Sequence, residues 1–93
     1  MAGFELGAPQ MTISQPTCSG AADLLVAARP TRMRLLITNL TAGADAYIGN
    51  SNSDATNGYL LAQGDSLVLE TTAALYGFTS AGTATFHVIE LHQ

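Results

Sequence analysis

The sequence has no tryptophan and no lysine, only one cysteine and two histidines, and only 11% charged residues. Cys18 alone cannot form an internal disulfide, and no cysteine and histidine group has the spacing of a metal site. A single domain of 93 residues buries only about 60–65% of the surface of its unfolded chain, so its core gives a thin margin of stability. Small domains without disulfides or a structural metal are often stabilised by association. We therefore expect an oligomer or a protein that docks on a larger body.

Positive charge is also scarce. The only basic residues are Arg29, Arg32 and Arg34, whereas seven carboxylates are spread along the chain and the net charge is −4. Non-specific nucleic-acid binding and binding to anionic membranes both need a basic field, so we expect neither partner. No apolar run reaches the ~20 residues of a membrane span, and the first residues lack the features of a secretion signal. We therefore expect synthesis in a reducing cytosol.

Apolar residues make up 47% of the chain, and they are arranged in short β-prone runs between glycine, asparagine and aspartate turns. Alternation with a period of two predicts strands rather than helices. The predicted strands span residues 10–14, 24–28, 32–40, 46–49, 59–62, 66–71, 75–79 and 83–92. About eight short strands at this spacing predict an all-β fold, an antiparallel β-sandwich of two sheets packed face to face. A jelly-roll is one candidate strand order, which periodicity alone does not fix.

The chain divides by composition. Residues 1–22 are rich in small and polar residues and predict an extended N-terminal arm, whereas residues 23–93 predict the β-sandwich domain. The arm carries single apolar residues at Phe4, Leu6, Met11 and Ile13. We expect it to be held at the edge of its own sheet or against a neighbouring chain by strand addition.

The predicted strand at residues 32–40 alternates in polarity. The pattern places Met33, Leu35 and Ile37 on one face and Arg32, Arg34 and Thr38 on the other. Leu36 interrupts the polar face, which indicates contact with a second layer or a partner. Two arginines on that face predict a basic stripe, used either to dock on an acidic patch or to pair with Glu70, Glu90 or Asp23 within the chain or between subunits.

No catalytic or metal-binding constellation is evident. His87 is predicted on a solvent face, His92 lies beside the C-terminus, and no nucleophile elbow is present. Asn50, Asn52 and Asp54 imitate the start of a calcium loop, but alanine and leucine occupy the positions of its glycine and its bidentate glutamate. We expect no enzyme activity and no cofactor. Glycan binding is an alternative, because Tyr47 and Tyr59 are candidates for stacking against sugar rings.

Several segments carry a resemblance to a known class of proteins. They are Arg32-Met-Arg-Leu-Leu-Ile-Thr-Asn39, Ala46-Tyr-Ile-Gly49, Asn57-Gly-Tyr-Leu-Leu-Ala-Gln-Gly-Asp65, Leu67-Val-Leu-Glu70 and Ala74-Leu-Tyr-Gly77. From Arg32 onward the sequence resembles small structural proteins of tailed bacteriophages, and most of all head decoration proteins, also called cement or auxiliary capsid proteins. The N-terminal third carries no such resemblance.

This resemblance implies a β-sandwich protomer that assembles as a homotrimer on the outside of a capsid and clamps major capsid protein subunits together. It implies a virion protein assembled in the cytoplasm of the bacterial host, and it supplies no site motif to transfer. The residues expected at the capsid or intersubunit interface are Phe4, Leu6, Met11, Ile13, Arg29, Arg32 and Arg34. The alternative is a glycan-binding or adaptor module of a phage tail or fibre.

Overall fold

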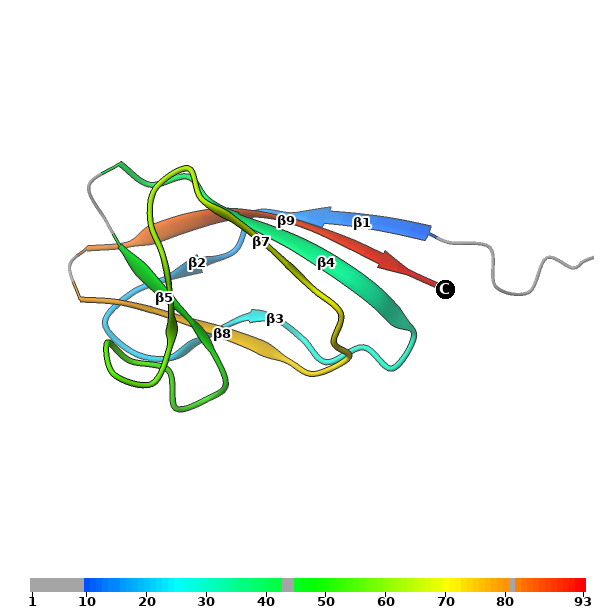
Figure 1. Ribbon diagram of the computed structural model, residues 1–93, viewed down its shortest axis with the longest axis horizontal. Coiled ribbons are helices and arrows are strands. Elements are labelled where there is room, and N and C mark those ends of the chain that lie inside the picture. Colours follow the sequence, from blue (N-terminus) through cyan, green and yellow to red (C-terminus); the bar gives the residue numbers. More distant parts are fainter. Residues whose placement is uncertain (1–9, 43–44, 81) are drawn as a thin grey trace, which may run out of the picture.

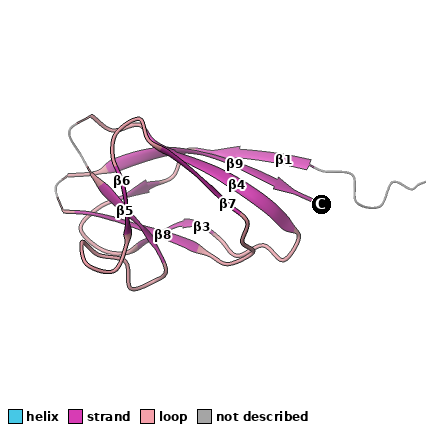
Figure 2. Cartoon of the chain, viewed as in Figure 1, coloured by secondary structure: helices cyan, strands magenta, loops and turns pink. Residues whose placement is uncertain are grey.

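The computed structural model describes residues 10–42, 45–80 and 82–93, and these residues form strands and loops without a helix (Figures 1 and 2). The strands are β1 (Gln10–Ser14), β2 (Thr17–Cys18), β3 (Asp23–Val26), β4 (Arg32–Asn39), β5 (Ala46–Gly49), β6 (Tyr59–Leu61), β7 (Ser66–Leu69), β8 (Leu75–Thr79) and β9 (Ala84–His92). The prediction of an all-β fold is confirmed. The short strand β2 was not predicted.

Two antiparallel sheets form the sandwich. The five-stranded sheet has the order β1-β9-β4-β7, with β2 also pairing with β9, and the four-stranded sheet has the order β3-β8-β5-β6. The pairs β2–β9, β3–β8, β4–β7 and β5–β6 are nested, as in one long hairpin rolled across two layers. This nesting is the jelly-roll order.

The core fills the space between the two sheets. Its fully buried side chains include Phe86, Leu35 and Ile37 from the five-stranded sheet and Leu61 from the opposite one. Gly77 on β8 leaves room for the Leu25 side chain of the neighbouring strand β3, since a Cβ added there would lie only 2.6 Å from Cδ1 of Leu25. Along β4, β5, β8 and β9, buried residues alternate with more exposed ones, as the sequence period of two predicted.

The described part of the predicted N-terminal arm, residues 10–18, pairs with the sandwich. β1 pairs with β9 through five consecutive residue pairs, and β2 pairs with the beginning of β9. Residues 10–18 are therefore a bent edge strand of the sandwich, held at the edge of their own sheet as one of the two expectations stated. Phe4 and Leu6 lie outside the described residues.

A β-bulge at the beginning of β4 changes which side chains point into the core and which point outward. The register with β9 shifts between Arg32 and Arg34, so Met33 is an extra residue that interrupts the alternation. As a result Arg32 faces the interior, Arg34 faces outward, and Met33 is 44% exposed. The predictions that Met33 is an inner-face residue and that Arg32 and Arg34 share a face are both wrong.

Candidate interaction surface

The outer face of the five-stranded sheet, the side turned away from the core, carries three rows of side chains that run across the strands. The first row, at the beginning of β7 and near the end of β4, contains Ser66, Thr38, His87 and Gln15. The middle row, called here the aliphatic row, contains Val68, Leu36, Ile89 and Ile13. The third row contains Glu70, Arg34, Leu91 and Met11.

The aliphatic row and its neighbours form an exposed apolar surface. Met11, Ile13 and Val68 are 63%, 65% and 57% exposed, which are high values for large apolar side chains. An antiparallel sheet with one face on a core normally shows polar residues on the other face. The outer face of this sheet instead has an apolar centre, the aliphatic row with Leu91 and Met11 beside it, between a polar row and the Arg34–Glu70 pair.

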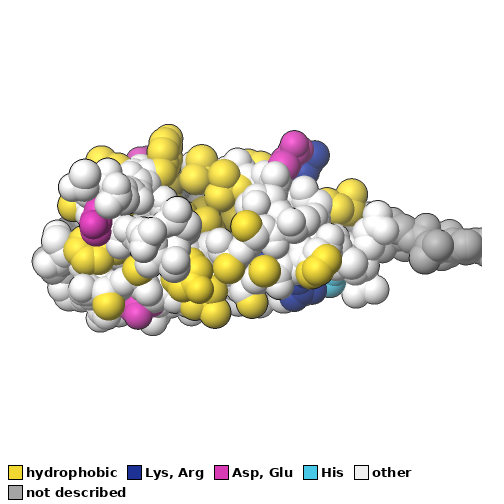
Figure 3. All heavy atoms as spheres, turned by 90° about the horizontal axis from the view of Figure 1, so that it is seen from below, with side chains coloured by type: hydrophobic (Ala, Val, Ile, Leu, Met, Phe, Trp, Pro, Cys, Tyr) yellow, Lys and Arg dark blue, Asp and Glu magenta, His cyan; other side chains and the backbone are white. Residues whose placement is uncertain are grey.

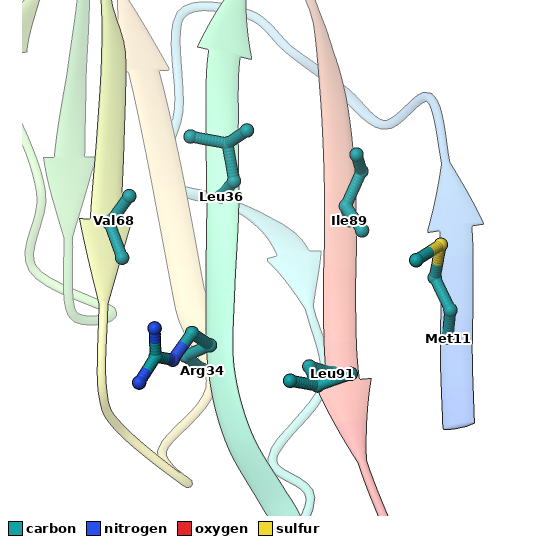
Figure 4. Close-up of a pocket in the computed structure, with 6 residues that line it drawn as sticks. All are labelled: Met11, Arg34, Leu36, Val68, Ile89 and Leu91. Atoms are coloured by element: carbon teal, nitrogen blue, oxygen red, sulfur yellow. The ribbon is translucent and has the colours of Figure 1, made fainter. Parts of the chain in front are cut away.

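A shallow groove lies within this face. It has a volume of about 260 Å³ and is lined by Met11, Arg34, Leu36, Val68, Ile89 and Leu91. Figure 4 shows these side chains projecting from the four neighbouring strands β7, β4, β9 and β1 toward one side of the sheet. Arg34 is the one charged residue among them, so the groove can be covered with little loss of ion hydration.

Arg32 is an interior structural residue. Its side chain is completely buried, and its Nε donates to Oε1 of Glu90 at 2.8 Å. Three more of its five N–H groups donate to the backbone carbonyl groups of Thr71, Ala73 and Ala27. Because the side chain is completely buried and four of its donors have acceptors within the chain, Arg32 is not exposed to an external partner.

Arg29, whose side chain is 35% exposed, extends this cluster toward the surface. Its Nε lies 3.4 Å from Oε1 of Glu90, and its NH1 donates to Nε2 of His92 at 2.8 Å. The Thr12 hydroxyl also lies 2.8 Å from Nε2 of His92. On the other side of the ring, Nδ1 of His92 lies 3.2 Å from the carbonyl oxygen of Gln93. The cluster fastens β1, β4 and β9 together at one end of the sheet.

Arg34 is the only arginine of the three whose side chain lies on the outer face. Its NH2 donates to Oε2 of Glu70 at 3.2 Å, and the two side chains are 57% and 70% exposed. The basic stripe predicted from Arg32 and Arg34 is therefore wrong. The alternative reading, pairing within the chain, is confirmed for Glu70 and Glu90.

The expected site residues thus separate into different places. Met11 and Ile13 lie on the outer face beside Leu91 and Ile89. Arg29 and Arg32 instead both pair with Glu90, Arg32 completely buried and Arg29 partly exposed. The sequence analysis did not select Val68, Ile89 and Leu91. The available signal was that β4, β7 and β9 contain adjacent apolar residues, and such uninterrupted runs are typical of strands covered on both faces.

The two tyrosines proposed as a stacking platform do not face the same way. Tyr47 is opposite Leu60 in the register of β5 and β6, and Tyr59 is opposite the buried Ile48. Adjacent register positions project from opposite faces of a sheet, so Tyr47 and Tyr59 cannot form one platform. Tyr47 lies instead beside Phe78, with ring centroids 6.3 Å apart.

Three other groups of the described residues, His87, Cys18 and Asp54, have defined surroundings. His87 lies exposed and its Nε2 is 3.0 Å from the Gln15 amide nitrogen. Burial, reinforced by the Asp23 carboxylate, raises the pKa of the Cys18 thiol to about 11, which keeps it protonated and poorly nucleophilic. Backbone N–H groups of Asn57 and Thr56 lower the pKa of Asp54, which organises the polar loop after β5.

Within residues 10–42, 45–80 and 82–93, no group of three or more His, Cys, Asp or Glu residues could hold a metal ion. The same residues include no helix long and apolar enough to span a membrane. On the side of the molecule where β3 and β8 lie, Figure 3 shows hydrophobic side chains spread over the surface with only a few charged groups between them.

No family model, curated protein or solved structure matches this chain.

Proposed function

We propose that this chain is a structural virion protein that decorates and stabilises the capsid of a tailed bacteriophage through protein–protein interfaces. The observation that carries the proposal is the aliphatic row on the outer face of the five-stranded sheet. Exposed apolar patches on small folded domains mark interaction sites, and this one lies on a rigid sheet instead of a loop.

The chemistry of the outer face suits a protein partner. Its charged groups, Arg34 and Glu70, already compensate each other at 3.2 Å, so the face offers apolar area with balanced charge. Interfaces between proteins have such an apolar centre with polar groups at the rim, and the row of Ser66, Thr38 and His87 provides a rim on one side. The proposed partner is the major capsid protein.

The fold agrees with this proposal but does not select it. Jelly-roll sandwiches occur in viral capsid proteins and also in lectin domains, and a fold alone does not define a function. The resemblance to head decoration proteins favours the capsid. It leads us to propose a homotrimer on the outer surface of the virion, assembled in the host cytoplasm.

The experiment that tests the proposal is quantitative co-sedimentation of the purified chain with undecorated phage heads. We expect saturation at a fixed, near-integer number of copies per major capsid subunit, because a symmetric shell offers identical sites. Absence of co-sedimentation, or only a few copies per particle, would reject the capsid function and direct attention to the tail.

The outer face is tested by placing one new charge at each of two positions on β9. Ile89→Lys puts a cation in the centre of the aliphatic row, whereas His87→Lys puts it one row away on the same face. We expect Ile89→Lys to weaken capsid binding by at least about a hundredfold and His87→Lys by less than about tenfold, since buried unpaired charge is costly only at the interface centre. Equal effects would show that the aliphatic row is not the docking surface.

A second function has one observation in its favour, the aromatic residues on the outer face of the four-stranded sheet. Tyr47 and Phe78 lie side by side there, and Tyr76 projects from the same face of β8. Aromatic faces of this kind stack on sugar rings, so the alternative is a glycan-binding module of a phage tail or fibre. Titration with host surface polysaccharide tests it. Tyr47→Ala should abolish binding, and Tyr59→Ala, on the opposite face, should leave it unchanged.

A further inference from the structure

The edge strand β1 has backbone groups available for another strand. β1 pairs with β9 on one side, and on its other side no element of the described residues pairs with it (Figure 1). In an antiparallel ladder, every second residue directs both its N–H and its C=O away from the neighbouring strand. The outer edge of β1 therefore presents a row of donors and acceptors that fits an extended backbone.

β1 also lacks the features that usually prevent such pairing. Its sequence, Gln-Met-Thr-Ile-Ser, has no charged residue and no proline, and its register with β9 has no bulge. Native sheets protect their edges with those features. β7, at the opposite edge of the same sheet, is protected in this way, because the exposed carboxylates of Asp65 and Glu70 flank it at both ends.

The side chains of β1 indicate which strand would fit. Met11 and Ile13 are the two most exposed large apolar residues of the described chain, and both lie on the outer face. The Thr12 hydroxyl points to the inner side, where it contacts His92. Gln10 and Ser14 are exposed and polar. Read from either end, the strand has the same pattern of polar and apolar positions around Thr12.

We infer that β1 is a strand-addition site whose occupant is β1 of a second copy of this chain, paired antiparallel about a two-fold axis at Thr12. In this register Met11 lies opposite Ile13 of the second copy, and Gln10 lies opposite Ser14. Each exposed apolar side chain is then covered by another, and no charge is brought near a like charge. The equivalent pairing of two β7 edges would place Asp65 opposite Glu70, two carboxylates.

The symmetry of this contact separates it from the trimer proposed above. A two-fold axis cannot relate the subunits of a three-fold ring, so the β1 contact joins neighbouring trimers instead of forming them. Five paired residues bury far less than the roughly 800 Å² per partner of a standard interface, so the contact is weak in dilute solution. On a capsid, where copies are already held close together, the same contact becomes effective through high local concentration.

Mixed disulfide trapping of the purified chain tests both the occupant and the register. Met11→Cys and Ile13→Cys are prepared as separate variants and oxidised alone or mixed. In the proposed register, residue 11 of one copy lies directly opposite residue 13 of the other, and the Cβ atoms of such a pair are about 5 Å apart, within reach of a disulfide. Residue 11 of one copy and residue 11 of the other are diagonal neighbours, with Cα atoms farther apart than about 7 Å, which is too far for a disulfide. Native Cys18 is buried and does not compete.

We expect the mixture to give about tenfold more disulfide-linked dimer than either variant alone, by the distance criterion for disulfide formation. The control is Val68→Cys, which places an exposed thiol on the β7 edge of the same sheet. Equal cross-linking in all samples, or none in the mixture, would overturn the inference. If the mixture gives no excess of linked dimer while amide exchange at β1 slows on undecorated heads, the edge belongs to a capsid subunit and the second-copy assignment is wrong.

A charge exchange provides a second test without thiols. Gln10→Lys with Ser14→Lys places like charges opposite each other across the two-fold axis, and Gln10→Glu with Ser14→Lys places opposite charges there. We expect the second variant to dimerise about tenfold more tightly, measured by sedimentation at high protein concentration. Identical association of the two variants would contradict the Thr12 register. Because the purified chain is used, this result is independent of capsid binding.

Discussion

The two faces of the five-stranded sheet have similar composition and opposite environments. Each carries aliphatic side chains and an arginine of β4 paired with a glutamate, Arg32 with Glu90 inside and Arg34 with Glu70 outside. Inside, the guanidinium is completely buried and donates to Glu90 and to three backbone carbonyl groups. Outside, the same kind of pair is solvated and the apolar side chains lie open. This difference is the basis of the proposal that a partner covers the outer face.

The largest expected difference concerns the two arginines. Arg32→Ala should lower the free energy of unfolding by about 3–5 kcal/mol, because it leaves the Glu90 carboxylate buried near a single remaining cation, Arg29. Urea unfolding monitored by circular dichroism measures the change. A loss below about 1 kcal/mol would mean that the buried pair is not part of the stable structure.

A similar contrast is expected between adjacent aliphatic residues of β4. Ile37 is fully buried, so Ile37→Ala should cost about 2–5 kcal/mol of unfolding free energy through the cavity that it leaves. Leu36 is half-exposed on the outer face, and Leu36→Ala should cost less than about 1 kcal/mol in the isolated chain. The same denaturation experiment compares them. Equal losses would show that the outer face is already covered in solution.

The dependence of stability on alkaline pH tests whether the Cys18 thiol is buried in the core. The thiol ordinarily titrates near 9.0 and in the folded chain near 11, so the unfolded state ionises first as the pH rises. This contribution to stability is complete below pH 9 and is lost as the pH rises toward 11, by an amount of the order of 2 kcal/mol. Thermal unfolding across this range measures it. Cys18→Ser, which cannot ionise there, should show a smaller decline, and an unchanged decline would refute the assignment.

The smallest effect is expected at the exposed ion pair. Arg34→Ala should change the unfolding free energy by less than about 1 kcal/mol, because solvent and salt screen the pair with Glu70. Measurements at low salt and at 1 M salt should show the difference shrinking further. A salt-independent loss of several kcal/mol would mean that Arg34 has an unrecognised structural role.

Much of the secondary structure could be predicted because strand periodicity is local. The positions of β1, β5 and β8 are as predicted, and the inward positions of Leu35 and Ile37 follow from alternation. The two-residue strand β2 was missed because so short a segment shows no periodicity. The predicted orientation of Met33 was wrong because the bulge at this residue reverses the inward and outward alternation on its N-terminal side. No residue type in that segment signals a bulge.

The candidate site was only partly predictable for a related reason. Leu36 was correctly recognised as an anomaly on an otherwise polar face, and Met11 and Ile13 were selected from the arm. The pairing partners that complete the surface, Ile89 and Leu91 on β9, lie far away in the sequence. Register between distant strands decides which side chains become neighbours, and hydrophobic pattern alone does not specify that register.

The sequence by itself determined the all-β class, the scarcity of charge and the impossibility of an internal disulfide, because composition and a local period of two are sufficient for these conclusions. Only the tertiary structure decided that Arg32 is buried while Arg34 is exposed, that residues 10–18 belong to the sandwich, and that apolar side chains from four strands form one outer face. These features depend on a bulge and on pairing between segments distant in the chain, which arise only when the two sheets form together.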